Sequence, residues 1–210
     1  MKISVKNVCK KFKDNVVLNN VSYEFESGKI YGLVGKNGSG KTVFLKLLTG
    51  LYTPDSGKFL VDGEDFNENK SYPKSMRALI ENPSFISDLS GYDNLKLLAS
   101  IQNKIGKKEI EEALKEVNLY DEKDKLFHKY SLGMKQKLGI AQVIMEDVDI
   151  LIFDEPFSAI EDDTVEKLRD LLKKLKKEGK LIIISTHLKE DIDKLADVVL
   201  KFNNGKVTEE

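Results

Sequence analysis

Hydrophobic residues fall into short continuous runs, separated by longer stretches in which they recur every three or four positions. The runs at Ile30–Val34, Ile150–Phe153 and Leu181–Ser185 have the length of a strand, the second of them within a strand predicted at 148–153, and residues 17–25 partly alternate between apolar and polar. A strand that is apolar along its whole length is typically buried on both faces, as in a parallel sheet covered by helices on both sides. The pattern therefore predicts an α/β fold around a mostly parallel sheet.

Helical periodicity is clearest in three stretches. Residues 43–48 predict a short helix after the first buried strand, and residues 165–175 predict a longer helix with one apolar face. The span 83–141 is mostly helical in pattern and lies between predicted strands. We therefore expect it to form an inserted helical lobe.

The charge balance argues against a dedicated nucleic-acid binder. The 210 residues include 34 Lys and Arg against 35 Asp and Glu, a net charge of −1, whereas such binders usually carry a basic excess. A lysine run near residues 173–177 fits a solvated helix face better than a nucleic-acid patch. No apolar run approaches the ~20 residues that span a bilayer, so we expect a cytoplasmic protein that needs a partner for any membrane role.

A glycine-rich loop follows the first buried strand. Residues 35–42 read G-K-N-G-S-G-K-T, which fits the phosphate-binding pattern G-x-x-x-x-G-K-[ST]. The glycines let successive backbone N–H groups point inward at phosphate oxygens, and the following helix adds the positive end of its dipole. Lys41 is expected to reach the β- and γ-phosphates and Thr42 to bind Mg²⁺. A plain glycine-rich turn is the alternative, which the position between strand and helix disfavours. The predicted nucleotide-binding residues here are Gly35, Asn37, Gly38, Ser39, Gly40, Lys41, Thr42 and Val43.

Two carboxylates, Asp154 and Glu155, follow the strand predicted at 148–153. Ligands in open α/β folds bind outside the carboxyl ends of the strands. Asp154 can hold Mg²⁺, through water, and Glu155 is then free to accept a proton from an attacking water. The alternative is a pair of surface acids after a core strand, which the presence of the phosphate loop disfavours.

Residues 130–137, Y-S-L-G-M-K-Q-K, precede this strand and look like the signature of the ABC ATPase family, usually written L-S-G-G-Q. Ser131 and Gly133 match its key positions, and three other positions depart from it. Together with the phosphate loop and the acidic strand, this signature segment makes the chain resemble the ABC ATPase family over residues 12–187. The variant signature is similar to that of the bacitracin-type peptide and antibiotic exporters.

The resemblance implies roles for further residues. Phe12 matches the aromatic residue that stacks on adenine. His187 matches the histidine that contacts the γ-phosphate and fixes the attacking water, and it joins Glu155 and Lys41 as a predicted catalytic residue. Ser131 and Gly133 match the residues that contact nucleotide across a dimer interface.

Three positions depart from the family pattern. Glu81 stands where the family has a glutamine that binds Mg²⁺ and senses the permease; glutamate can still bind Mg²⁺ but adds negative charge near the phosphates. Glu161 replaces an aspartate, and its longer side chain is expected to disturb the usual contact across the dimer. Val43 replaces a frequent threonine and removes one hydroxyl contact to the α-phosphate.

The fold implied by the resemblance is that of a P-loop NTPase of the RecA-like kind. Residues 1–82 and 142–210 would form the nucleotide-binding core, a mostly parallel sheet with an antiparallel β-subdomain. Residues 83–141 would form the helical subdomain that carries the signature segment. All 210 residues would then make a single ABC ATPase domain.

The function implied is that of the ATP-hydrolysing subunit of an ABC transporter, with ATP and Mg²⁺ as cofactors. It would work as a homodimer or heterodimer with ATP at the interface, peripheral on the inner face of the cell membrane. It would drive export of a peptide, antibiotic or hydrophobic compound through a permease on a separate chain. A soluble ABC ATPase without a permease and a nucleotide-dependent switch remain alternatives. The short helical lobe disfavours a DNA-repair ATPase, and intact Glu155 and His187 disfavour the switch.

Overall fold

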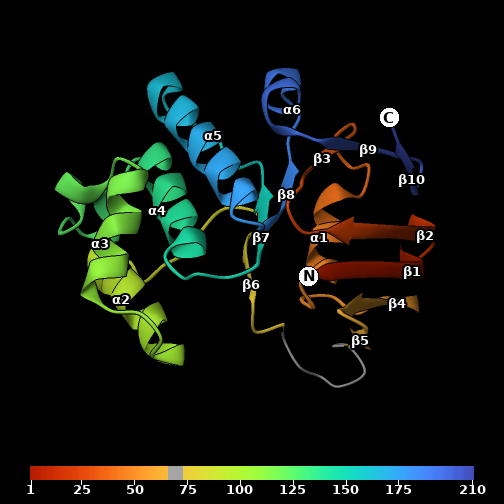
Figure 1. The fold of residues 1–210 in the computed structure, drawn as a ribbon, viewed down its shortest axis with the longest axis horizontal. Coiled ribbons are helices and arrows are strands. Elements are labelled where there is room, and N and C mark those ends of the chain that lie inside the picture. Colours follow the sequence, from red (N-terminus) through yellow and green to blue (C-terminus); the bar gives the residue numbers. More distant parts are fainter. Residues whose placement is uncertain (66–72) are drawn as a thin grey trace.

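The computed structural model describes residues 1–65 and 73–210, which form two sheets and a group of helices (Figure 1). The central sheet has the order β10-β9-β3-β8-β7-β6, in which every neighbouring pair except β10–β9 is parallel. The second sheet is antiparallel, with the order β2-β1-β4-β5. The strands are β1 (Lys2–Phe12), β2 (Asn15–Glu26), β3 (Ile30–Val34), β4 (Ser56–Val61), β5 (Glu64–Asp65), β6 (Met76–Leu79), β7 (Ile150–Asp154), β8 (Leu181–Ser185), β9 (Val198–Asn203) and β10 (Lys206–Glu209).

The helices lie on both sides of the central sheet. Figure 1 shows α2, α3 and α4 gathered at one end of the molecule, with the antiparallel sheet at the other. Among the described residues, no helix combines the length and apolar character needed to cross a membrane. The α-helices are α1 (Lys41–Leu48), α2 (Gly91–Gln102), α3 (Lys107–Glu116), α4 (Leu132–Ile144), α5 (Asp162–Lys177) and α6 (Lys189–Leu195), and the short 3₁₀ helices are η1 (Tyr120–Glu122) and η2 (Phe127–Lys129).

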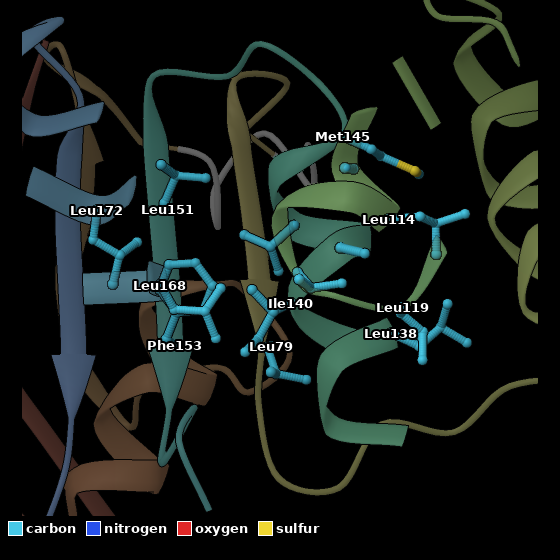
Figure 2. Close-up of a cluster of buried hydrophobic side chains, with 14 of the residues drawn as sticks. Leu79, Leu114, Leu119, Leu138, Ile140, Met145, Leu151, Phe153, Leu168 and Leu172 are labelled. Atoms are coloured by element: carbon cyan, nitrogen blue, oxygen red, sulfur yellow. The ribbon is translucent and has the colours of Figure 1, made fainter. Parts of the chain in front are cut away.

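The central sheet separates two hydrophobic cores, and β7 contributes to both. Ile150 and Ile152 pack with α1 and the antiparallel sheet, whereas Leu151 and Phe153 pack with the helices on the other face (Figure 2). This split follows from the two-residue period of a strand. It explains why the strand is apolar from Ile150 to Phe153, as expected for a strand buried on both sides.

The predicted α/β fold is confirmed, including the antiparallel sheet. Strands Ile30–Val34 and Leu181–Ser185 have the predicted bounds, and the helix predicted at 43–48 begins two residues earlier, at Lys41. Helix α4 runs to Ile144, so the end predicted for the helical lobe at residue 141 falls within its last turn. The division into subdomains stays a prediction.

Strand order fixes where the predicted site residues lie. Because β8 lies between β3 and β7, the carboxyl ends of all three strands are adjacent. Ser185, the last residue of β8, is in register with Asp154 on one side and Leu33 on the other. The phosphate loop after β3 and the two carboxylates at the end of β7 therefore meet at one edge of the sheet.

Candidate functional site

The phosphate loop, residues 35–42, connects β3 to α1 with a backbone that only glycine adopts readily. Gly35, Gly38 and Gly40 have φ values of 152°, 78° and 103°. A Cβ on Gly35 would also lie 2.6 Å from the backbone oxygen of Phe202. Glycine at these positions is therefore required by the loop itself, and the loop leads directly into the N-terminus of α1.

Two polar groups in this loop fit a bound phosphate. Lys41 is almost fully buried, and its ammonium group donates a hydrogen bond to the backbone oxygen of Gly35 at 2.7 Å. Among the described residues, Ser39 Oγ is the one buried side-chain polar atom without a hydrogen-bond partner. A buried hydroxyl without a partner is costly, and a phosphate oxygen would satisfy it.

Asp154, at the end of β7, is held by two hydroxyls. Thr42 Oγ1 donates to Oδ2 of Asp154 at 2.8 Å, and Ser185 Oγ donates to its other carboxylate oxygen. The hydroxyl and carboxylate groups gathered here offer only oxygen atoms as metal ligands, the ligand type that Mg²⁺ prefers. No group of three or more His, Cys, Asp or Glu in the described chain could hold a metal ion. The donors nevertheless fit Mg²⁺, which commonly takes one or two protein carboxylates and completes its shell with water and phosphate oxygens.

Glu155 and His187 are brought together from the ends of β7 and β8. Nδ1 of His187 lies 2.8 Å from Oε2 of Glu155. Glu155 has a left-handed backbone, with φ 49°, and its N–H donates to the Ser185 carbonyl at 3.0 Å. Gln136, on α4, donates to the carbonyls of Glu155 and Pro156, at 3.1 Å each. The chain therefore leaves the strand in a turn that directs the Glu155 side chain at His187.

The signature segment, residues 130–137, forms the start of α4. Ser131 is the N-cap of this helix, and its Oγ accepts the backbone N–H of Met134 at 3.2 Å. A Cβ on Gly133 would lie only 2.4 Å from the carbonyl oxygen of Ala159. Residues of α1 and α4 pack in the cores on opposite faces of the central sheet. The contacts of Ser131 and Gly133 in this chain are with their own helix and the turn after β7, and the structure does not bring them to the phosphate loop.

The structure places Glu161, a departure from the family pattern, beside the same helix. Glu161 Oε2 lies 2.7 Å from Nζ of Lys137, a nearly buried residue of α4. This pairing within the chain was not predicted. The hydrogen bond from Lys137 lowers the pKa of the Glu161 carboxyl below its ordinary value.

The remaining predicted residues lie around α1. Phe12, at the end of β1, is 43% exposed and stands edge-on to Tyr52, with ring centres 5.7 Å apart. Glu81 pairs with Lys46 at 2.6 Å, and this hydrogen bond raises the pKa of Lys46. Glu81 follows the carboxyl end of β6, the neighbour of β7, and its partner Lys46 lies one helical turn beyond Thr42 on α1. Val43 packs its side chain toward the core on the α1 face.

Two hollows flank the phosphate loop. One, of about 550 Å³, lies between the loop, the start of β2 and the turn between β9 and β10. The other, of about 840 Å³, lies between the loop, the turn at His187 and α6. Each offers room beside Gly35 and Asn37 for a ligand that bears phosphates.

Two residues that contact the site were not predicted from the sequence. Ser185 hydrogen-bonds Asp154, and Gln136 hydrogen-bonds the backbone at Glu155. Gln136 lies within the signature segment, whereas the only signal for Ser185 was its position at the end of an apolar strand.

A phosphate loop between a parallel strand and a helix, opposite an aspartate on a nearby strand, defines the class of P-loop nucleotide triphosphatases. Within that class, the family model described as ABC transporter matches residues 18–158 of this chain. The chain belongs to the ABC transporter family, as an ATP-binding subunit, and it is an ABC ATPase.

Known relatives agree with this assignment. The ABC transporter ATP-binding protein YybJ of Bacillus subtilis is 43% identical over 98% of this chain and 94% of its own length. The bacitracin transport ATP-binding protein BcrA of Enterococcus faecalis is 39% identical over 99% of this chain and 68% of its own length. Among solved structures, a dimeric bacterial ABC transporter cassette has a TM-score of 0.91 at 24% identity, covering 99% of this chain and 97% of its own. That last likeness shows the fold.

Proposed function

We propose that this chain is the ATP-hydrolysing motor of a transporter that exports a peptide or antibiotic through a separate permease. The observation that carries the catalytic part is the contact between Glu155 and His187, next to the Thr42–Asp154 pair at the same sheet edge. The export part rests on relatives named for bacitracin and lantibiotic transport. A soluble ABC ATPase without a permease is the second candidate, and the docking experiment described in the Discussion separates the two.

The phosphate loop would bind the triphosphate. Its backbone N–H groups, including that of Val43, and the Ser39 hydroxyl would contact phosphate oxygens. Lys41 would exchange its bond to the Gly35 carbonyl for the β- and γ-phosphates. Phe12 offers an exposed ring on which adenine can stack.

Thr42 and Asp154 would hold Mg²⁺, with Glu81 as a further ligand if it leaves Lys46. When bound, Mg²⁺ neutralises negative charge on the phosphate oxygens. Glu155 would accept a proton from the attacking water as general base. His187, already beside Glu155, would orient that water and the γ-phosphate.

A second subunit, identical or homologous, would complete the site. Ser131 and Gly133 lie at the N-terminus of α4, where backbone N–H groups and the helix dipole favour an anion. Because α4 packs on the sheet face opposite α1, these residues would serve the nucleotide of the partner subunit. We further propose that residues 83–141 act as the helical subdomain, and that the assembly works at the inner face of the cell membrane.

The test of the catalytic assignment is Glu155→Gln. The amide keeps the size of the side chain but cannot take up a proton, so we expect ATP binding to persist while turnover falls by ~10²-fold or more. Phosphate release and nucleotide binding should be measured in parallel on the purified subunit. Near-normal phosphate release by the variant would remove Glu155 from the proposed role.

A further inference from the structure

A buried ion pair lies beneath the turn that carries His187. Arg169, on α5, and Asp191, on α6, are only 4% and 2% exposed. Nε and Nη2 of Arg169 both donate to Oδ1 of Asp191, the first at 3.1 Å. Nη1 of Arg169 donates hydrogen bonds to the exposed carboxylates of Glu166, at 2.5 Å, and Glu190, at 3.1 Å. All three nitrogens of the planar guanidinium are therefore held by carboxylates, which fixes its orientation.

The Arg169 guanidinium stays charged although it is buried. Burial acts to lower the pKa of Arg169, but its hydrogen bond to Asp191 and the nearby carboxylates outweigh burial, so the pKa lies above its ordinary value. Removing one partner of a buried ion pair leaves an uncompensated charge. The pair therefore holds α5 and α6 in a fixed relation.

The second carboxylate oxygen of Asp191 extends this contact into the turn. Thr186 Oγ1 donates to Oδ2 of Asp191 at 3.0 Å and accepts the backbone N–H of Leu188 at 3.1 Å. Thr186 and Leu188 are the two neighbours of His187 in the chain. One buried hydroxyl thus connects both of them to the ion pair.

The same guanidinium also contacts the segment after Glu155. The Cζ atom of Arg169 lies 5.9 Å from the ring centre of Phe157, two residues beyond Glu155. A cation over an aromatic ring is attracted by the ring's negative face. Arg169 therefore contacts both segments whose ends meet in the pair of Glu155 and His187.

We propose that Arg169, Asp191 and Thr186 form a positioning device that holds His187 against Glu155 for ATP hydrolysis, with the Thr186 hydroxyl as the connecting link. All three residues are 4% exposed or less, and in this proposal each acts through His187. The proposal rests on the roles proposed above for Glu155 and His187. The competing explanation is that the cluster only fastens α6 to α5.

The deciding variant is Thr186→Val, with Thr186→Ser as its matched control. Valine keeps the shape of threonine but removes the hydroxyl, whereas serine keeps the hydroxyl. A hydrogen bond to a charged group has a strength that corresponds to about tenfold or more in rate. We expect Thr186→Val to lower kcat by about that factor, with KM for ATP within about twofold of the parent, and Thr186→Ser to stay within about twofold on both.

A second comparison separates positioning from loss of folded protein. If Thr186 acts through His187, Thr186→Val should add no further loss in a His187→Ala background. A loss of folded protein would instead lower kcat by the same factor in both backgrounds. Arg169→Lys, which keeps the charge but loses the fork, should show the same dependence on His187. Lys194→Ala, which removes an exposed lysine that pairs with Glu166 and Glu190 but does not contact Arg169, Asp191 or Thr186 in any described hydrogen bond, should leave kcat unchanged.

Parent-like kcat in Thr186→Val, or an equal loss with and without His187, would overturn the positioning device and leave the proposed function intact. Parent-like kcat in Glu155→Gln and His187→Ala would overturn both. The two failures are thus distinguishable on one set of purified subunits.

Discussion

At the scale of single residues, Gly133 is required for packing as well as for its predicted contact with nucleotide. Its Cα faces the carbonyl of Ala159, a residue that itself has a left-handed backbone with φ 61°. Any side chain at position 133 would have to push the start of α4 away from this turn. The space constraint exists within one subunit, without ATP or a partner.

We therefore expect Gly133→Ala to destabilise the isolated subunit in the absence of nucleotide. Forcing a methyl group into a filled space costs about 1–3 kcal/mol, which lowers the melting temperature by about 2–4 °C per kcal/mol in a chain of this size. Leu132→Ala, on the neighbouring exposed residue, is the control and should change the melting temperature little. Equal melting temperatures for the parent and Gly133→Ala would show that the close approach does not limit this position.

At the scale of elements, the start of α4 and the turn after β7 form one unit. Gly133 contacts Ala159, Gln136 hydrogen-bonds the backbone at Glu155, and Lys137 pairs with Glu161. The glutamate at position 161, expected to disturb a contact across the dimer, is already paired inside the subunit. The signature segment and the catalytic strand should therefore move together.

The pairing of Lys137 with Glu161 predicts a pH effect. Lys137→Met should raise the pKa of the Glu161 carboxyl toward its ordinary value of 4.5, because the hydrogen bond that lowers it is lost. A carboxyl whose pKa is lowered by folding stabilises the protein above its unfolded pKa, and this contribution disappears as pH falls through the folded pKa.

The melting-temperature difference between the parent and Lys137→Met should thus be largest near neutral pH and shrink below about pH 4.5. NMR titration of the Glu161 carboxyl gives the direct measurement. Lys135→Met, on the same helix but over the Phe127 ring, is the control and should leave this titration unchanged. An unaltered Glu161 titration in Lys137→Met would contradict the pairing.

Strands and helices whose own residues show an uninterrupted hydrophobic pattern could be predicted from the sequence, whereas elements with an interrupted or very short pattern could not. The fully apolar runs gave strands β3 and β8 with their bounds, because burial on both faces leaves no polar position to confuse the pattern. Strand β1 was missed because its register shifts between Val5 and Val8 interrupt the alternation. Strand β6, with four residues, and helix α6, with seven, are too short to show a period.

The same distinction applies to the site. Residues in continuous motifs, such as Lys41 and Asp154, could be predicted as site residues, because the sequence immediately around each of them identifies the loop or strand end to which it belongs. Ser185 and Arg169 could not, because their contacts depend on strand register and on helix packing between distant segments. Side-chain burial in the segment after Glu81 could not be predicted either: Phe85 packs its ring 5.3 Å from that of Phe127, whereas its neighbour Ile86 is exposed.

At the scale of the whole molecule, one subunit contains only part of each proposed nucleotide site. The variant Glu155→Gln, which binds but does not hydrolyse ATP under the proposal, should dimerise when ATP is added. Adding Ser131→Arg should abolish this, because the bulky cation would fill the contact with the γ-phosphate. Sedimentation with and without ATP measures the dimerisation. As the control, Ser100→Arg, on α2, added to Glu155→Gln should leave ATP-dependent dimerisation unchanged. ATP-dependent dimers of the Ser131→Arg double variant would place Ser131 outside the interface.

We propose that the apolar segment after Glu81 contacts the permease, and this can be tested at Ile86, which is 50% exposed. Ile86→Ser should leave basal ATPase activity within about threefold, since surface substitutions rarely disturb a fold. It should lose co-purification with the permease from membranes, whereas Ile101→Ser, on a more exposed isoleucine at the end of α2, should keep it. Retained co-purification would move the docking surface elsewhere, and absence of any membrane partner for the parent would favour a soluble ATPase.

The alternation of β7 between two cores also limits how this gene can change in length. Asp154 faces Thr42 because it has the same parity as Ile150 and Ile152, which pack on the α1 side. Deleting or inserting one codon within the strand would exchange the two faces, bury the wrong residues in both cores and turn the carboxylate away from Thr42. A substitution within β7 changes one side chain on one face, whereas a single-codon insertion or deletion exchanges both faces and disables folding and the active site together.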